Sequence, residues 1–463
     1  MGIGMRVLLS SVWIWLLAFI FVASPYSAHA TDSPTPAEAE GRIAELEEKV
    51  DLLTEEMGRL ETIFAVPEAL ELESVYGLGP AASKIYLKDK GLSIGGYGEI
   101  RLRTFHDKNG ANENEDDVFD ALRAVLYVGY KFNDNWVLNS EFEFEHAGTG
   151  GGGSVSTEML TIDYLWRQEA NFRAGLLLVP MGFINEIHEP NFFFGAERPE
   201  VERLIIPTTW RENGVGIFGR IADRVEYRVY VINGLNACGT DRKCDAAAGA
   251  KGFSSGGLRG GRQKGSRALA NDFAIVGRVD VDVAAGLLLG GSIYTGNSGQ
   301  DQNGAMSGLN LPNARTTIYE VHAQYRGHGV SLRSLWTEAF VNQAGKLSLA
   351  LSLGDDPALG GGSKSIANHM RGWYVEGAYD ILPSILKETR MSLEPFVRYE
   401  QYDTQRDVNS RFARDKSKDI ELVVAGLQFK PIPEVVFKVD YRHFNLAQGS
   451  RADEVQALVG YLF

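Results

Sequence analysis

The feature that most constrains the fold of this chain is an alternation of apolar and polar residues, with a period of two, from residue 92 to the end. Each alternating segment is about ten residues long, close to the roughly 9–11 residues in which a tilted β-strand crosses a bilayer. Beyond the first 30 residues, no apolar run approaches the roughly 20 residues of a membrane-spanning helix. The pattern therefore predicts strands, and a chain of this kind enters a membrane as strands.

The alternation predicts about sixteen strands, an even number that suits a closed outer-membrane barrel. The predicted strands are residues 93–105, 119–131, 135–146, 158–167, 170–179, 214–221, 224–233, 272–282, 286–294, 316–326, 330–340, 371–380, 391–402, 420–430, 435–444 and 454–463. Short turns alternate with long loops between them, as in barrels with short periplasmic turns and long external loops. We expect an all-β fold, an antiparallel transmembrane barrel over residues 92–463 with both ends in the periplasm.

The two faces of the predicted strands differ as a lipid boundary requires. In residues 141–145 three glutamates share one face and two phenylalanines the other. A charge on the lipid face near the midplane costs about 2–4 kcal/mol, so charges confined to one face fit a membrane. A soluble sandwich also alternates, but aromatic residues near the strand ends, such as Trp136 and Tyr461, favour the membrane interpretation.

The alternation is interrupted at residues 180–213, the third long loop, which is longer than structureless loops usually are. Its apolar residues include Phe192, Phe193, Phe194 and Trp210, and its four prolines exclude one continuous helix. We expect this loop to fold into the barrel lumen and to narrow the pore, with the three phenylalanines wedged against the wall.

Charged residues of the third loop and of the first two strands form the candidate pore-lining set. They are Arg101, Arg103, Arg123, Glu186, His188, Glu189, Glu197, Arg198, Glu202, Arg203 and Arg211. The three strand arginines are expected to form one basic side of the pore. However, the polar faces of the strands carry both signs of charge in similar numbers, which predicts cross-strand ion pairs and weak selectivity.

Catalysis is not expected in this loop. Residues 185–190 lack the two-histidine helical spacing of zinc proteases, and Pro190 prevents a helix from continuing. Nothing in the sequence positions a nucleophile beside a base. We therefore expect no enzyme, no metal and no cofactor.

The residues before the barrel are expected to be processed and to lie in the periplasm. Residues 1–30 have the basic, apolar and small-residue regions of a secretory signal, with cleavage after Ala30. Residues 31–66 predict a periplasmic coiled coil, and residues 67–91 a connector. The predicted seam consists of Ile43, Leu46, Val50, Leu53, Met57, Leu60 and Phe64. The alternative is an amphipathic helix lying on its own domain.

The two cysteines and the net charge indicate a disulfide and restrict the kinds of binding partner. Cys238 and Cys244 are the only two cysteines, and their close spacing in an exported chain predicts a local disulfide. The net charge of −14 and the scattered basic residues exclude nucleic acid as the expected partner. The basic, glycine-rich loop at residues 234–271 is either a solvated loop, which we favour, or a contact for lipopolysaccharide phosphates beside the outer-membrane lipid.

The chain ends in residues 458–463, LVGYLF, and a final strand with a C-terminal Phe resembles the assembly signal of outer-membrane barrels. Together with residues 95–99 (GGYGE) and 180–182 (PMG), this ending is similar to Gram-negative porins of the phosphate-selective O/P type. The resemblance implies sixteen strands, a homotrimer in the outer membrane, a third loop inside the pore, and passage of small hydrophilic solutes with phosphate or another anion preferred.

The mixed charges depart from that family, in which Arg and Lys line the pore. The alternatives are a weakly selective or cation-leaning general porin and a structural protein whose coiled coil tethers the envelope. A barrel enzyme would need a Ser/His/Asp or paired-carboxylate site, and the sequence shows no such cluster.

Overall fold

The computed structural model describes residues 41–54, 72, 74–106, 115–240, 242, 244, 252–304, 307–351, 365–386 and 389–463. The chain divides into two units, Met1–Val66 and Pro67–Phe463. In the first unit, residues 41–54 form an α-helix, as predicted. No helix in the described part of the chain is long and apolar enough to cross a membrane.

The predicted seam of the coiled coil falls only partly within this helix. Ile43, Leu46, Val50 and Leu53 are all exposed along it. Met57, Leu60 and Phe64 lie outside the described residues, as does the predicted signal peptide. Pairing of this helix with another therefore stays a prediction.

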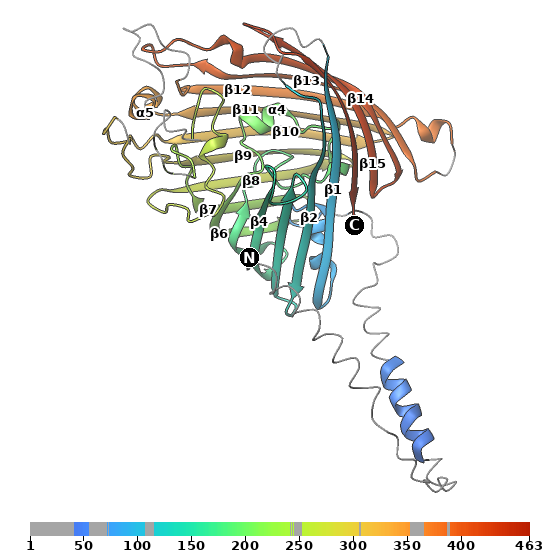
Figure 1. The fold of residues 1–463 in the computed structure, drawn as a ribbon. Coiled ribbons are helices and arrows are strands. Elements are labelled where there is room, and N and C mark those ends of the chain that lie inside the picture. The colour runs from blue at the N-terminus through green and yellow to red at the C-terminus, as the bar shows by residue number, and fades with distance from the viewer. Residues whose placement is uncertain are drawn as a thin grey trace, which may run out of the picture. The chain divides into compact units, whose positions relative to one another are not determined.

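The described residues of the second unit form sixteen antiparallel strands that close into one barrel (Figure 1). Consecutive strands are paired, and β1 pairs with β16 to close the sheet. The strands are β1 (Gly91–His106), β2 (Val118–Lys131), β3 (Trp136–Glu145), β4 (Ser154–Arg167), β5 (Ala170–Leu178), β6 (Arg211–Ile221), β7 (Val225–Asn233), β8 (Phe273–Ala284), β9 (Leu287–Gly296), β10 (Thr316–Gly327), β11 (Val330–Val341), β12 (His369–Tyr379), β13 (Ser392–Asp407), β14 (Asp419–Ile432), β15 (Val435–Leu446) and β16 (Asp453–Leu462). The predicted all-β barrel is confirmed.

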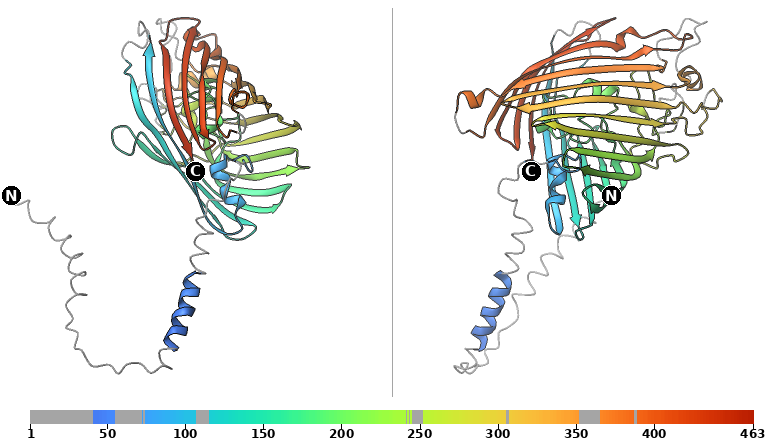
Figure 2. Two further views of the ribbon diagram at one scale, coloured as in Figure 1. Left: turned by 90° about the vertical axis from the view of Figure 1, so that its right-hand side faces the viewer. Right: turned by 180° about the vertical axis from the view of Figure 1, so that it is seen from behind.

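Short helical elements lie before the first strand of the barrel and in the connections between strands. They are α3 (Pro80–Ser83), η1 (Lys84–Leu87), η2 (Pro190–Phe192), α4 (Glu200–Leu204), η3 (Arg259–Gly261), α5 (Ala344–Ala350), η5 (Leu382–Ser384) and η6 (Lys416–Lys418). Two of them, η2 and α4, belong to the third loop. Figure 2 shows α3 and η1, in blue, beside the first strands of the barrel.

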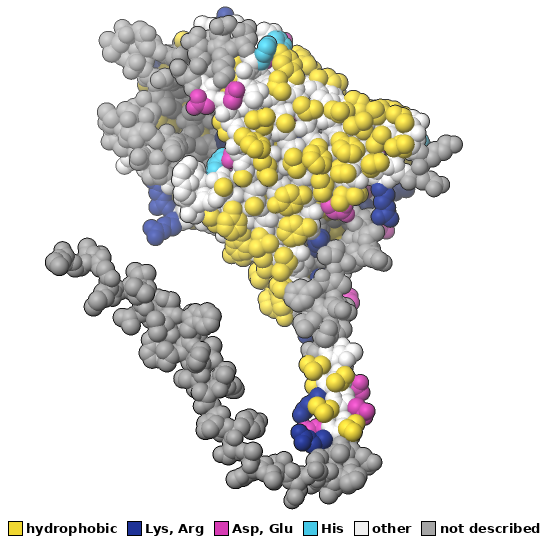
Figure 3. Space-filling model, turned by 45° about the vertical axis from the view of Figure 1, so that its right-hand side comes forward, with side chains coloured by type: hydrophobic (Ala, Val, Ile, Leu, Met, Phe, Trp, Pro, Cys, Tyr) yellow, Lys and Arg dark blue, Asp and Glu magenta, His cyan; other side chains and the backbone are white. Residues whose placement is uncertain are grey.

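Alternate residues of each strand face the lumen, because side chains of a strand point to opposite faces in turn. In β15, Lys438, Asp440 and Arg442 are buried, whereas Val439 and Tyr441 between them are exposed. Hydrophobic side chains cover much of the outer face that Figure 3 shows, and large exposed hydrophobic residues occur on strands all around the barrel. The charged faces of the predicted strands thus line the interior.

The two ends of the barrel differ in their connections. At the short-turn end, Ala222 and Asp223 join β6 to β7 with positive φ angles of 50° and 56°, the type I′ geometry that suits the twist of a hairpin. The first residue of β1, Gly91, pairs with Lys131 at this end. The loops at the opposite, long-loop end include the third loop.

Candidate functional site

The third loop lies inside the barrel, where cations of the wall bind its backbone. Arg398 of β13 donates to the carbonyl oxygen of Phe194 at 2.9 Å. Lys438 of β15 donates to the carbonyl oxygens of Phe193 and Gly195 at 2.5 and 3.0 Å. Hydrogen bonds from charged donors are stronger than neutral ones, so these contacts hold the middle of the loop against β13–β15.

Side chains of the loop form a second set of anchors on other strands. Glu186 accepts from Arg228 of β7 at 2.9 Å, and Glu202 accepts from the hydroxyl of Tyr374 of β12 at 2.7 Å. Glu200 accepts from Arg442 of β15 at 2.8 Å. The loop is therefore attached on several sides of the lumen, and the mixed charges of the wall serve largely to hold it.

The phenylalanines of the loop also contact the wall. The ring of Phe194 stacks on Phe396 with centroids 5.4 Å apart, and the ammonium group of Lys438 lies 3.9 Å from the ring centroid of Phe193. Phe192 packs on a cluster that includes Tyr97 and Tyr127. These contacts match the expected wedging of the loop against the barrel.

The strand arginines of the candidate set have different environments. Arg123 lies between Glu99 and Glu143, at 2.6 and 3.4 Å, so carboxylates compensate its charge. Arg101 pairs with Glu197 of the third loop. Arg103 stacks over Phe105 at 5.1 Å and makes no ion pair within the described residues. Of the three, Arg103 therefore leaves its charge open to the lumen.

The remaining loop residues of the candidate set are mostly buried. Their contacts are His188 with Glu141 at 3.0 Å, Arg198 with the carbonyl oxygen of His188 at 3.4 Å, Arg203 with Glu200 at 2.5 Å, Arg211 with Glu158 at 2.5 Å, and Glu189 against Gly79. That any of them contacts a passing solute stays a prediction.

Burial and neighbouring charges divide the loop carboxylates into two kinds. Burial opposes ionisation of Glu197, but the charges of Arg101 and Arg442 lower its pKa below the ordinary value. Glu189 lacks a neighbouring arginine of that kind, and burial raises its pKa to about 7. The third loop thus carries a carboxylate held ionised and another that titrates near neutral pH.

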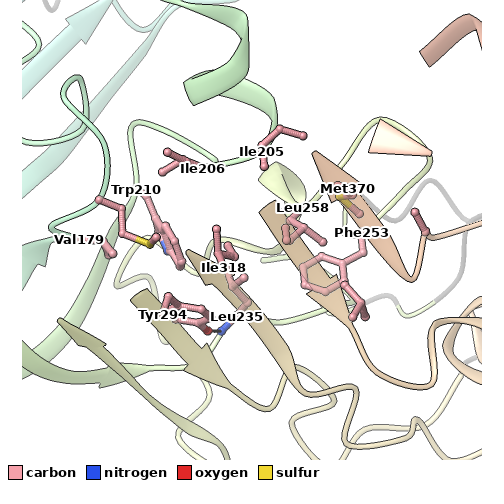
Figure 4. Packing of buried hydrophobic residues seen from close by; sticks show 14 of the residues in the cluster. Val179, Ile205, Ile206, Trp210, Leu235, Phe253, Leu258, Tyr294, Ile318 and Met370 are labelled. Carbon is pink, nitrogen blue, oxygen red and sulfur yellow. Dashed lines mark hydrogen bonds between the residues drawn. The ribbon is translucent and has the colours of Figure 1, made fainter. Parts of the chain in front are cut away.

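At the long-loop end, apolar residues of the loops pack against the apolar inner wall of β7–β14. Trp210 at the end of the third loop lies with its ring centroid 4.8 Å from that of Tyr294 (Figure 4). Ile205 and Ile206 join the same cluster, as do Leu235 and Phe253 from the loop between β7 and β8. This packing fills the β7–β14 side of the lumen at that end.

Cys238 and Cys244 belong to this cluster and form a disulfide with an S–S distance of 2.02 Å. Both cysteines are buried. The disulfide therefore closes a small ring in the loop between β7 and β8, and both of its ends lie in the apolar cluster.

At the short-turn end, the lumen contains residues 74–90, which we call the luminal segment. It includes α3 and η1, and it belongs to the stretch expected as a connector. Leu78, Ala81 and Ile85 are buried against lumen-facing residues of the first strands. The signal that would have revealed it is a pair of lumen-facing glycines, Gly95 and Gly129, since a strand position without a side chain admits a close backbone.

Among the described residues, two cavities lie in the lumen, at opposite ends and on opposite sides. The outer cavity, of about 450 Å³, is lined by Arg101, Arg103, Asp120 and His146 at the long-loop end. The inner cavity, of about 280 Å³, lies between the luminal segment, the third loop and β7–β11. Its charged lining is Glu186, Glu226, Arg228, Arg278, Asp280, Asp282, Arg326 and Arg333.

Among the described residues, no group of three or more His, Cys, Asp or Glu side chains is placed to hold a metal ion. The side chains that line the two cavities offer ionic and hydrogen-bonding contacts.

An uncharacterized protein of Aquifex aeolicus (strain VF5) is 35% identical over 413 residues, covering 88% of this chain and 86% of that protein. No family model matches the sequence.

The barrel shares its fold with one solved outer-membrane protein and superposes less closely on two others. OmpF of Salmonella typhi, in a complex with daunomycin, superposes with a TM-score of 0.53 at 12% identity, over 81% of this chain and 98% of OmpF. The outer-membrane channel DcaP of Acinetobacter baumannii gives 0.49 at 11% identity, over 80% and 97%. An anion-selective porin from Comamonas acidovorans gives 0.45 at 12% identity, over 81% and 100%.

Proposed function

On the premise that the chain belongs to the same family as the Aquifex aeolicus protein and has the fold of an outer-membrane porin, we propose that it is a porin for passive diffusion of small hydrophilic solutes. The observation that carries the proposal is a pair of charged cavities inside a closed barrel whose outer face is apolar. A polar interior behind an apolar outer face is the arrangement of outer-membrane channels, and the two cavities are the parts of the lumen in which water and solute have room.

The proposed path runs obliquely through the barrel. A solute enters at the outer cavity beside Arg101 and Arg103, because the loop cluster fills the other side of that end. It passes the third loop, where Glu197 contacts Arg101, and leaves through the inner cavity beside Arg326 and Arg333. The third loop sets the size and the charge of the passage.

Anions, with phosphate first among them, are the proposed preferred solutes. Arg103 and Arg326 line the two cavities and make no ion pair within the described part of the chain, so their charges favour an anion. The alternative is a weakly selective general porin. The observation in its favour is that wall arginines such as Arg123, Arg228 and Arg398 are matched by carboxylates.

The same proposal covers assembly and location. Residues 1–30 direct export and are cleaved after Ala30, residues 31–66 form a periplasmic coiled coil, and residues 67–463 assemble as a homotrimer in the outer membrane, next to lipid and lipopolysaccharide. The apolar outer face of the barrel supports the membrane location. The short-turn end is then periplasmic and the long-loop end external.

Planar-bilayer recording of the purified mature protein tests the proposal. In a potassium chloride gradient we expect conductance steps in groups of three and a reversal potential on the anion side, with chloride current reduced by added phosphate. A reversal potential near zero or on the cation side, without block, would favour the weakly selective porin. Absence of any conductance would refute a porin.

An envelope tether is the other candidate, and a variant lacking residues 31–66 separates the two. A porin without its coiled coil keeps conducting in bilayers. A tether loses its envelope phenotype in cells although its barrel is intact.

A further inference from the structure

The luminal segment, residues 74–90, occupies space through which solutes would otherwise pass. We propose that it is a second constriction of the channel, which fills the β1–β5 side of the periplasmic half and confines solutes to the inner cavity along β7–β11. The inference rests on the proposed function, because a constriction has meaning only in a barrel that conducts.

The segment packs as part of the barrel interior. Leu78, Ala81 and Ala82 belong to one apolar cluster with lumen-facing residues of β1, β2, β4 and β16, and all three are almost fully buried. On the strand side the cluster contains Tyr97, Val125, Tyr127, Met159 and Leu462, together with Leu178 at the end of β5. Because this surface would otherwise be exposed to water in the lumen, its burial favours the segment staying in place.

Hydrogen bonds tie the segment to successive strands of the wall. Asn139 of β3 donates its side-chain amide to the carbonyl oxygen of Ala82 at 2.9 Å. The hydroxyl of Tyr86 donates to Asp163 of β4 at 2.6 Å and accepts from Arg173 of β5 at 3.0 Å. These contacts use specific polar side chains of the wall, which hold the segment in one position along the barrel.

The wall is shaped to receive the segment. A Cβ atom at Gly95 of β1 would lie 2.7 Å from the carbonyl oxygen of Ala81, and one at Gly129 of β2 would lie 2.8 Å from the Cβ atom of Ile85. Both glycines occupy lumen-facing positions, where a side chain would push the segment away. The complementarity on these two strands shows that the segment and the wall fit each other directly.

The segment also approaches the third loop and the far wall. A Cβ atom at Gly79 would overlap the carboxylate of Glu189, and one at Gly77 would overlap the guanidinium of Arg228. The segment therefore reaches the residues that anchor the third loop. Between them remains the inner cavity of about 280 Å³, lined by Ser74, Gly77 and Pro80 on the segment's side.

The test compares variants of the full mature chain in planar bilayers and in liposome swelling with sugars of increasing size. The double variant Gly95→Leu/Gly129→Leu excludes the segment from the wall but keeps the strand hydrogen bonds. A second variant replaces residues 74–90 by a Gly/Ser linker of equal length. The matched control is Gly277→Leu, on the outer face of β8, where an added Cβ atom meets nothing nearer than 3.9 Å.

We expect both test variants to conduct at least twofold more than the wild type and to admit larger sugars, with the control unchanged. Equal conductance and an equal size limit for wild type and folded variants overturn the inference while leaving the porin intact. A silent wild type refutes the proposed function, and the inference falls with it whatever the variants do.

Heat-dependent mobility on gels identifies the variants whose barrels have closed. If the leucine variant does not fold, the linker variant decides the outcome, since it leaves every strand residue in place.

Discussion

Arg326 is the charge in the inner cavity whose removal tests the proposed route most cleanly. It is exposed to the lumen near the short-turn end of β10 and makes no ion pair or side-chain hydrogen bond within the described residues. The substitution Arg326→Gln therefore removes one positive charge without breaking an anchor of the fold. Asp282→Asn removes a negative charge from the same cavity, and within the described part of the chain Asp282 pairs only with the half-exposed Arg220, at 3.0 Å.

The size of the effect follows from the size of the cavity. A sphere of about 280 Å³ has a radius of about 4 Å, so an ion at its centre lies roughly 5 Å from the guanidinium of Arg326. At that distance in water, two unit charges interact by about 0.8 kcal/mol, a factor of about four in occupancy. The anion loses this factor and the cation gains it, so the permeability ratio changes by up to about 16-fold before screening by salt.

The reversal potential in a potassium chloride gradient measures this ratio. We expect Arg326→Gln to lower chloride permeability relative to potassium by between about twofold and about 16-fold, and Asp282→Asn to shift the ratio in the opposite direction. The control is Arg167→Gln, which removes a largely exposed charge that does not line the inner cavity. The reasoning is refuted if the folded Arg326→Gln protein conducts with an unchanged reversal potential, or if the control shifts it equally.

Three further perturbations act on the packing inside the barrel. Burial raises the pKa of Glu189 from 4.5 to about 7. The stability that this shift contributes, up to about 3 kcal/mol, is fully present below pH 4.5 and is lost as the pH rises through 7. Hydrogen exchange of the luminal segment should therefore accelerate across this range beyond the intrinsic rate, and Glu189→Gln should remove this pH dependence. Trp210→Ala deletes a fully buried side chain and should destabilise the protein by about 3–5 kcal/mol, seen as a lower thermal midpoint, whereas an unchanged midpoint would show that the cluster contributes little. Replacing Cys238 and Cys244 by serine opens a loop with a sequence separation of 6 and should cost about 2 kcal/mol locally, so a protease should cut this loop faster while the barrel midpoint stays nearly constant.

Most of the barrel could be predicted from local patterns in the sequence. The side-chain alternation of a strand has a period of two, so Lys438, Asp440 and Arg442 could be assigned to one face from the sequence, and the structure places all three in the lumen. The length of each segment and the alternation of short and long connections then gave the number of strands. The disulfide between Cys238 and Cys244 was also local, because the two cysteines lie in one loop.

The occupants of the lumen could not be deduced in the same way. The sequence indicated that the third loop enters the barrel, but the partner of Glu200 is Arg442, 242 residues away in the chain. Such a pair exists only after closure of the barrel brings β15 opposite the loop. The charges that seemed available to line a pore are therefore largely used as anchors.

What the sequence by itself determined is the barrel, its faces and the presence of a loop inside it, because these follow from the conformation of each strand and from the length of each connection. The luminal segment was decided only by tertiary structure. Residues 74–90 have the composition of a connector, and they fold because Gly95, Gly129, Asn139 and Asp163 meet on one inner surface after four strands have paired. A surface assembled from distant strands has no local pattern in the chain, and so its contents become visible only in three dimensions.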